Sequence, residues 1–256
     1  MYKRQRLDLL NLRRSEDCFV DELFGTATAL GAPLMKARFP RAWLDVNREP
    51  FELDPNMFHD PLPAHVNTAS ARVAGGLGTS PRIVSEGENI YLDTLSWPDA
   101  DRRIQHYYMP YHEALRDLMA GTFKRFQTAI LVDCHSMPSV AGLSGSGRPD
   151  IVLGDRHGTS CSAWIVRHLE EQLRAHGLKV SRNRPYAGGF ITQKYGRPRE
   201  DVHAVQIEVN RGLYMNETTL KKTRGFSRLQ TLMLDVMSRF IARASETTPP
   251  RSIAAE

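Results

Sequence analysis

Cysteine is scarce in this chain: Cys18, Cys134 and Cys161 are the three cysteines among its 256 residues. They match neither a Cys-x-x-Cys pair nor a disulfide framework, so a reducing compartment is expected. No apolar run approaches the ~20 residues that a membrane-spanning helix needs. The opening segment Met1–Gln5 is not followed by the apolar core of a secretion signal. These absences exclude a disulfide scaffold and favour a cytoplasmic protein without a membrane anchor.

A strong imbalance of charge is also missing. The formal net charge is +5, and the basic residues are scattered, many of them in mixed-charge segments such as Arg167–His176. Solvated helix faces account for most of this charge, and the chain has no RNA-binding or helix-turn-helix pattern. Nucleic acid is therefore not an expected partner. Some of the arginines in loops could instead bind a small anionic substrate.

Internal repeats and linkers are absent as well, so we expect a single domain over residues 1–244 and a frayed polar tail over 245–256. Strands are predicted over 34–39, 42–46, 128–132, 150–153, 179–181 and 204–209, and helices over 16–30, 98–125 (kinked at Pro110), 162–176 and 217–243. Strands that alternate with helices predict an α/β fold: a mixed, mostly parallel sheet with helices on both faces.

The first segment with chemical content is Asp133-Cys-His-Ser136, which follows the apolar run 128–132. In open α/β sheets, ligands bind in the crevice at the carboxyl ends of the strands. An imidazole delivered there, between an acid and a hydroxyl, suits a metal ligand or a proton shuttle. His135 could equally be a structural histidine at the end of a strand, and the segment alone does not decide between these interpretations.

A second segment, Val205–Arg211, alternates polar and apolar side chains. Gln206, Glu208 and Asn210 fall on one face of the predicted strand because side chains in a strand alternate with period two. A glutamate that points into an α/β protein is costly unless it is paired or used. Glu208 is therefore either on the wet face of an edge strand or a general base whose pKa is tuned by burial or by a nearby metal.

Five motifs then add up to a resemblance. In order along the chain they are Asp45-Val-Asn-Arg48, Asn67-Thr68 with Arg72, Asp133-Cys-His-Ser136, Gly188-Gly-Phe-Ile-Thr192 with Tyr195-Gly196, and Val205-Gln-Ile-Glu208 with Tyr214. Together they resemble the N-formylglutamate amidohydrolase family, over about Leu12 to Glu217. The resemblance implies a zinc carboxypeptidase-like (phosphorylase/hydrolase-like) fold, a mononuclear Zn²⁺ site, and hydrolysis of N-formyl-L-glutamate to formate and L-glutamate in histidine degradation.

The resemblance also implies roles for particular residues. His135 matches the downstream histidine ligand of the metal, and Glu208 matches the general base. Arg48, with Asn47, is the first candidate to bind the anionic intermediate or a substrate carboxylate. The further candidate substrate contacts are Arg72, Arg211, Thr192 and Tyr195. A dicarboxylate product argues for at least two cations in the pocket.

The chain departs from the family pattern at its start. Relatives carry an upstream Pro-His-type segment whose histidine is an expected zinc ligand, whereas no histidine precedes His59 here. We therefore expect that the first strand is missing, through truncation or a mis-started reading frame. Asp17, ahead of Glu16 and Asp21, is the acid expected to serve as a metal ligand. These acids could also simply favour the positive end of a helix.

Two alternatives remain open. The first is a deacylase of another N-acyl amino acid, because pocket size and the number of arginines decide the substrate. The second is a folded but inactive fragment that lacks a metal-ligand histidine, since two ligands cannot hold zinc as three do.

Overall fold

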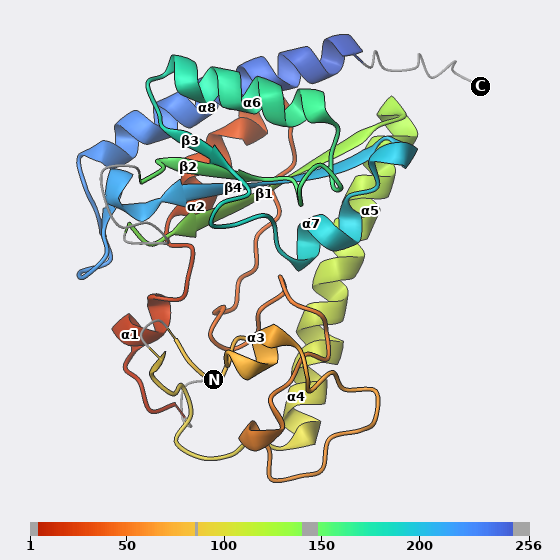
Figure 1. Cartoon of the computed structure of the whole chain (residues 1–256), viewed down its shortest axis with the longest axis vertical. Helices are drawn as coiled ribbons and strands as arrows, with labels where there is room; N and C mark the ends of the chain where they lie inside the picture. Colours follow the sequence, from red (N-terminus) through yellow and green to blue (C-terminus); the bar gives the residue numbers. More distant parts are fainter. Residues whose placement is uncertain (1–4, 85–86, 140–147, 248–256) are drawn as a thin grey trace. The chain divides into compact units, whose positions relative to one another are not determined.

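The computed structural model describes residues 5–84, 87–139 and 148–247 (Figure 1). The chain divides into two compact units, which are described in turn. The first comprises Met1–Glu16 and Ala37–Arg116, and the second comprises Asp17–Lys36 and Asp117–Glu256. The single domain expected over 1–244 stays a prediction.

The second unit is built on a four-stranded sheet. Its strands are β1 (Ala129–Met137), β2 (Ile151–Gly154), β3 (Val180–Arg182) and β4 (Val202–Asn210), in the order β1-β4-β2-β3. β1 runs parallel to β4, and β2 runs parallel to β3, but β2 is antiparallel to β4. The expected α/β fold with a mixed, mostly parallel sheet is confirmed.

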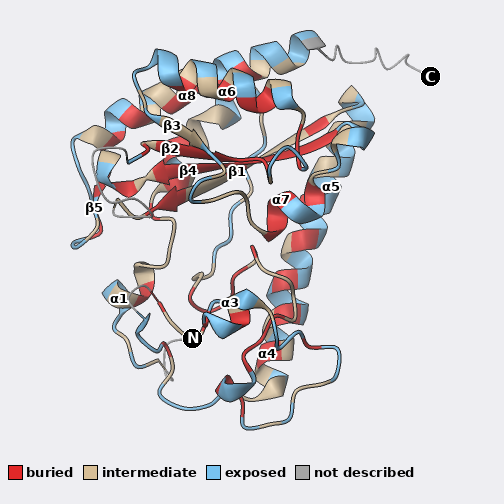
Figure 2. Cartoon of the chain, viewed as in Figure 1, coloured by how far each residue is buried: buried red, intermediate tan, exposed pale blue. Residues whose placement is uncertain are grey.

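Helices α6 (Ala163–Ala175) and α8 (Gly225–Thr247) lie over one face of this sheet, and α7 (Phe190–Tyr195) lies on the other side (Figure 1). The core between the sheet and α6/α8 is apolar and includes Val205, Ile207 and Val209 of β4, all at most 1% exposed. Figure 2 shows this inner layer as buried. Because side chains alternate along a strand, Gln206 and Glu208 project from the opposite face, away from the apolar core.

The first unit consists mainly of loops and short helices. These are α1 (Leu9–Arg13), a 3₁₀ helix (Pro55–Met57), α3 (Ala71–Ala74), α4 (Trp97–Arg103), a π-helix (Ile104–Tyr108) and the start of α5 (Met109–Phe126). In the described part of this unit, strand-like pairing is limited to isolated bridges such as Glu52 with Asn67. Small apolar clusters, such as the one around Leu53, Met57 and Leu95, hold it together.

Several predicted elements are corrected by the structure. The strands expected over 34–39 and 42–46 do not form, and a turn with a Trp43 N–H to Pro40 carbonyl hydrogen bond takes the place of the second. Prolines at positions 33 and 40 lack the N–H that a strand ladder requires. The expected strand 128–132 extends to Met137 as β1, so Asp133 and His135 lie inside it.

The helices also differ at their ends. The helix expected over 16–30 begins only at Val20 as α2 (Val20–Gly25) and continues as a 3₁₀ helix, because Phe19 adopts a left-handed conformation (φ 64°). The irregularity expected at Pro110 appears just before it, as the π-helix. The helix expected from residue 217 begins at Gly225, after a hairpin of β5 (Met215–Asn216) and β6 (Lys221–Lys222). The tail expected over 245–256 begins inside α8, and residues 248–256 lie outside the described residues.

Candidate active site

The polar face of the sheet brings four of its side chains into two neighbouring pairs. Parallel pairing of β1 and β4 sets Asp133 beside Gln206 and His135 beside Glu208. Their shared face follows from the period-two alternation of both strands. Glu208 and His135, which two separate sequence patterns indicated, therefore lie side by side on the same face of the sheet.

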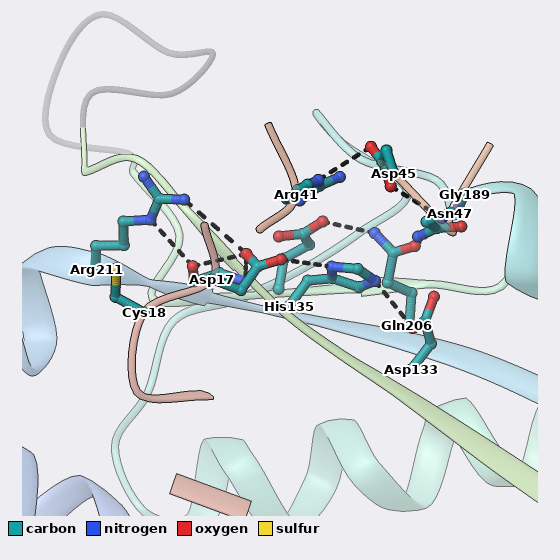
Figure 3. Close-up of polar contacts among 12 residues, drawn as sticks. Asp17, Cys18, Arg41, Asp45, Asn47, Asp133, His135, Gly189, Gln206 and Arg211 are labelled. Atoms are coloured by element: carbon teal, nitrogen blue, oxygen red, sulfur yellow. Dashed lines mark hydrogen bonds and ion pairs between the residues drawn. The ribbon is translucent and has the colours of Figure 1, made fainter. Parts of the chain in front are cut away.

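His135 stands between two carboxylates (Figure 3). Its Nδ1 lies 3.0 Å from Oδ2 of Asp17, and its Nε2 lies 2.9 Å from Oδ1 of Asp133. Burial alone would lower the pKa of His135, but Asp133 and Asp17 together outweigh it and raise this pKa well above the usual value. Without a metal, the two acids therefore favour the protonated form of the ring.

Asp17 is fixed by three further groups. Its Oδ1 accepts hydrogen bonds from the Ser136 N–H and the Ser136 hydroxyl, both at 2.8 Å. Arg211 donates from Nε to the Ser136 Oγ at 3.0 Å, and its Nη2 lies 3.9 Å from Asp17. The turn before α2, with Phe19 in the left-handed region, presents Asp17 to β1. Asp17 thus has one oxygen bound to the strand backbone and the other directed at His135.

The two rival acids have other partners. Glu16 accepts a hydrogen bond from Arg13, and Asp21 pairs with Lys36 at 2.6 Å on the surface. Of the three acids weighed from the sequence, Asp17 is the one that the structure places at His135.

Glu208 is held by its neighbour on the same strand. Its Oε1 accepts a hydrogen bond of 2.6 Å from Nε2 of Gln206, and Oε1 of Gln206 accepts one of 2.8 Å from the Gly189 N–H. Gly189 precedes α7, which carries Thr192 and Tyr195; both side chains are buried. The Thr192 hydroxyl donates to the Gly189 carbonyl at 2.8 Å, so in this structure it stabilises the turn that reaches Gln206.

The first unit holds a separate cluster of arginines and acids. The Arg48 guanidinium donates from Nε to the Leu77 carbonyl and from Nη1 to the Asn47 carbonyl, both at 2.8 Å, and its Nη2 lies 3.6 Å from Asp45. Arg41 also pairs with Asp45, at 3.0 Å. Burial favours the neutral form of Asp45, but Arg41 and Arg48 keep its pKa below the usual value. Asp45 therefore favours its ionised form and pairs with the guanidinium groups of Arg41 and Arg48.

Arg72 belongs to the same unit and is less constrained. Its Nη1 lies 3.5 Å from Oε2 of Glu52, at an ion-pair distance. Asn47 is placed by the Asp45 carboxylate, which accepts a 2.9 Å hydrogen bond from the Asn47 N–H. The three candidate substrate residues of this unit, Asn47, Arg48 and Arg72, thus gather around Asp45 and Glu52.

Sequence reasoning did not identify the residues that support these groups. Tyr108 donates to the Arg48 carbonyl at 2.6 Å, and Nε2 of His112 lies 2.9 Å from the Val46 carbonyl. Two side chains one helical turn apart therefore hold the backbone of the segment 45–48. The sequence signal was the four-residue spacing of Tyr108 and His112. Asp133 and Gln206 were visible at strand positions, but nothing in the sequence assigned them partners.

The described residues contain no group of three His, Cys, Asp or Glu side chains placed to hold a metal ion. Over the same residues, no helix combines the length and apolar character that crossing a membrane requires. In the second unit, the expected ligands His135 and Asp17 face one another at 3.0 Å.

Fold and site together define an α/β protein whose polar sheet face carries a histidine–carboxylate cluster beside a glutamate. Residues 1–215 match the family model for N-formylglutamate amidohydrolase. The chain is 31% identical over 206 residues to N-formylglutamate deformylase from Pseudomonas putida, covering 79% of this chain and 71% of that protein. The N-formylglutamate deformylase of Pseudomonas aeruginosa PAO1 is likewise 31% identical over 206 residues, which cover 78% of this chain and 71% of that protein. The chain belongs to the N-formylglutamate amidohydrolase family and is a hydrolase of linear amides.

Solved structures agree with this assignment. The crystal structure of N-formylglutamate amidohydrolase from Ralstonia eutropha JMP134 matches with a TM-score of 0.90 at 33% identity, over 95% of this chain and 89% of that one. A protein from Agrobacterium tumefaciens matches with a TM-score of 0.65 at 16% identity, over 93% and 82% of the two chains, which supports the fold alone.

Proposed function

We propose that this protein hydrolyses the formyl amide of N-formyl-L-glutamate to formate and L-glutamate. The observation that carries the proposal is Glu208 held on the same sheet face as the His135–Asp17 pair, in a chain whose relatives bear that activity in their names. In the reaction a water oxygen adds to the formyl carbon, the C–N bond breaks, and the leaving amine gains a proton. A carboxylate that takes the proton from water can return it to the amine.

We also propose that the enzyme uses Zn²⁺, with His135 and Asp17 as ligands. The two donors face one another, and Asp133 on the far side of the imidazole is the kind of partner that orients a metal-bound histidine. The fit is partial, because catalytic zinc usually has three protein ligands and the described residues offer two. When bound, zinc supplies a water of lowered pKa and polarises the formyl oxygen.

The remaining roles fall to charged and polar side chains. Glu208 accepts the proton of the attacking water and later protonates the amine. Arg211, buried beside Ser136 and Asp17, supplies positive charge for the anionic intermediate or a substrate carboxylate. Arg48, Asn47 and Arg72 bind substrate carboxylates, for which Arg48 and Arg72 offer planar, bidentate donors. In the second unit, Tyr195 of α7 is a further candidate substrate contact, whereas the Thr192 hydroxyl already bonds the Gly189 carbonyl.

The proposed activity would serve histidine degradation in the cytoplasm, with a small anionic substrate and no nucleic acid or membrane as partner. A deacylase of another N-acyl amino acid uses the same chemistry with a different pocket. The second candidate is a folded protein without turnover, since the described residues hold no group of three metal donors.

Two substitutions test the proposal. Glu208→Gln should lower turnover of N-formyl-L-glutamate by about 10²- to 10⁴-fold, as expected for a lost general base, and leave the zinc content unchanged. His135→Ala should lose both zinc and turnover. Glu171→Gln, on the exposed surface of α6, is the matched control and should change neither. Normal turnover in Glu208→Gln would rule out the general-base role, and metal-free wild-type protein without formate release would support the inactive form.

A further inference from the structure

The amide of Gln206 has one possible orientation. A backbone N–H can only donate, so the group that faces the Gly189 N–H at 2.8 Å must be the Gln206 oxygen. The Gln206 NH₂ is then directed at Glu208, whose Oε1 it approaches to 2.6 Å. Both side chains are buried, with 4% and 7% of their surface exposed. Gln206 therefore presents a donor, and not an acceptor, to the glutamate.

Two glycines allow the backbone at Gly189 to come this close to the sheet. Gly154 lies opposite Gln206 in the β2–β4 pair, and a Cβ there would sit 2.7 Å from the Gly188 nitrogen. Gly188 itself has a φ of +118°, and a Cβ on it would come within 2.6 Å of the Thr192 hydroxyl. The segment 187–189 thus packs directly on the polar face of the sheet. The closeness of this packing fixes the Gly189 N–H as an anchor for Gln206.

The next peptide group, which carries the Gly189 carbonyl, is held as well. Its carbonyl accepts hydrogen bonds from the Thr192 hydroxyl at 2.8 Å and from the Gln193 N–H at 3.2 Å. Figure 3 shows Gly189, Gln206 and His135 in the same close-up of the sheet. A continuous path of hydrogen bonds therefore connects the first turn of α7 to the carboxylate of Glu208.

We propose that Gln206 is a positioning residue that holds the Glu208 carboxylate in place for proton transfer. This inference rests on the proposed function, in which Glu208 is the general base. A donor at 2.6 Å restricts the carboxylate to one rotamer. The anchor at Gly189 keeps the donor from turning away. The Gln206 amide bonds the Gly189 N–H with its oxygen and Glu208 with its NH₂, so it is placed to act through Glu208.

Two substitutions separate the two hydrogen bonds of Gln206. Gln206→Met has a similar length and removes both bonds. Gln206→Glu keeps an oxygen toward the Gly189 N–H but replaces the donor toward Glu208 by a second carboxyl oxygen. Gln193→Met, on the exposed face of α7, is the matched control because it removes an amide from the same segment without touching Glu208.

Both Gln206 variants should lower kcat for N-formyl-L-glutamate by about 10- to 100-fold, the value of one charge-assisted hydrogen bond, and change KM by less than about twofold. Exchange of the Gly189 amide proton should accelerate in Gln206→Met and stay slow in Gln206→Glu. Crystal structures of the full chain should show the Glu208 carboxylate in one rotamer in the wild type and displaced in Gln206→Met. Melting temperature reports whether each variant folds.

A wild-type kcat in Gln206→Met, or an unmoved Glu208 carboxylate in its crystal structure, would overturn the positioning role while the proposed function stood. If the wild-type chain releases no formate, the proposed function fails. The position of Glu208 in the variant crystals and the exchange at Gly189 then decide the inference without any activity.

Discussion

The Asp17–His135 contact allows a stability prediction that needs no substrate. Asp17→Asn keeps the shape of the side chain, and its amide oxygen can still accept from the Ser136 N–H and hydroxyl. The substitution removes the negative charge that faces His135 at 3.0 Å. In metal-free protein the loss should therefore come from the charge of Asp17, chiefly through His135 and, at 3.9 Å, through Arg211, and leave the turn before α2 in place.

The size and the pH dependence follow from the environment of the pair. The two side chains are 12% and 18% exposed, so solvent screens the interaction little. A charge-assisted hydrogen bond contributes about 1.5–3 kcal/mol, which is the expected destabilisation at pH 6. Because the folded pKa of His135 is raised, this contribution is fully present below the unfolded value of about 6.5 and is lost as pH rises through the folded pKa.

Urea unfolding with a metal chelator, from pH 6 to pH 10, measures this effect. The difference between wild type and Asp17→Asn should be largest at pH 6 and shrink as the pH rises. Asp21→Asn is the control: its pair with Lys36 is more than a third exposed on both sides, and it should change stability by less than about 1 kcal/mol. A loss in Asp17→Asn that is independent of pH, or no loss at all, would refute the ion pair.

Three further predictions concern packing, acid stability and substrate binding. Gly154→Ala should destabilise the protein by about 1–3 kcal/mol in urea unfolding, because its Cβ would meet the backbone at Gly188, whereas Gly121→Ala, in α5 with open space around it, should stabilise by up to about 1 kcal/mol. Burial lowers the pKa of His203, so the unfolded chain takes up a proton first and stability should fall as pH drops below about 6.5. His203→Gln should flatten that slope, and an unchanged slope would refute the assignment. Arg72→Gln should raise KM for N-formyl-L-glutamate about 10-fold or more with kcat nearly unchanged, and a fall in kcat alone would contradict a role in binding.

The sequence was most informative where an element has a simple pattern. β1 and β4 were predicted from their apolar runs, and the alternation along Val205–Arg211 correctly put Gln206 and Glu208 on one face. The antiparallel direction of β2 was not predictable, since strand direction depends on how the connections cross the sheet. The six-residue α7 was missed because the glycines before it read as a turn.

In the candidate site, too, some residues could be predicted from the sequence and others could not. Glu208 could be selected from its position on a predicted strand and His135 from its position just after one, and the register of β1 and β4 sets them side by side. Asp17 could not be distinguished from Glu16 and Asp21 by sequence, because the left-handed turn at Phe19 decides which acid faces β1. The anchor from Gly189 to Gln206 depends on a close approach of two backbones, which no local pattern encodes.

Formate release is the most direct measurement of the central claim. The full chain, supplied with Zn²⁺, should release formate from N-formyl-L-glutamate in step with free glutamate, and much faster than it releases acetate from N-acetyl-L-glutamate. Equal or greater turnover of the acetyl compound would replace the proposed substrate by another N-acyl amino acid. No formate from zinc-supplied, folded protein would contradict the proposed activity of this chain.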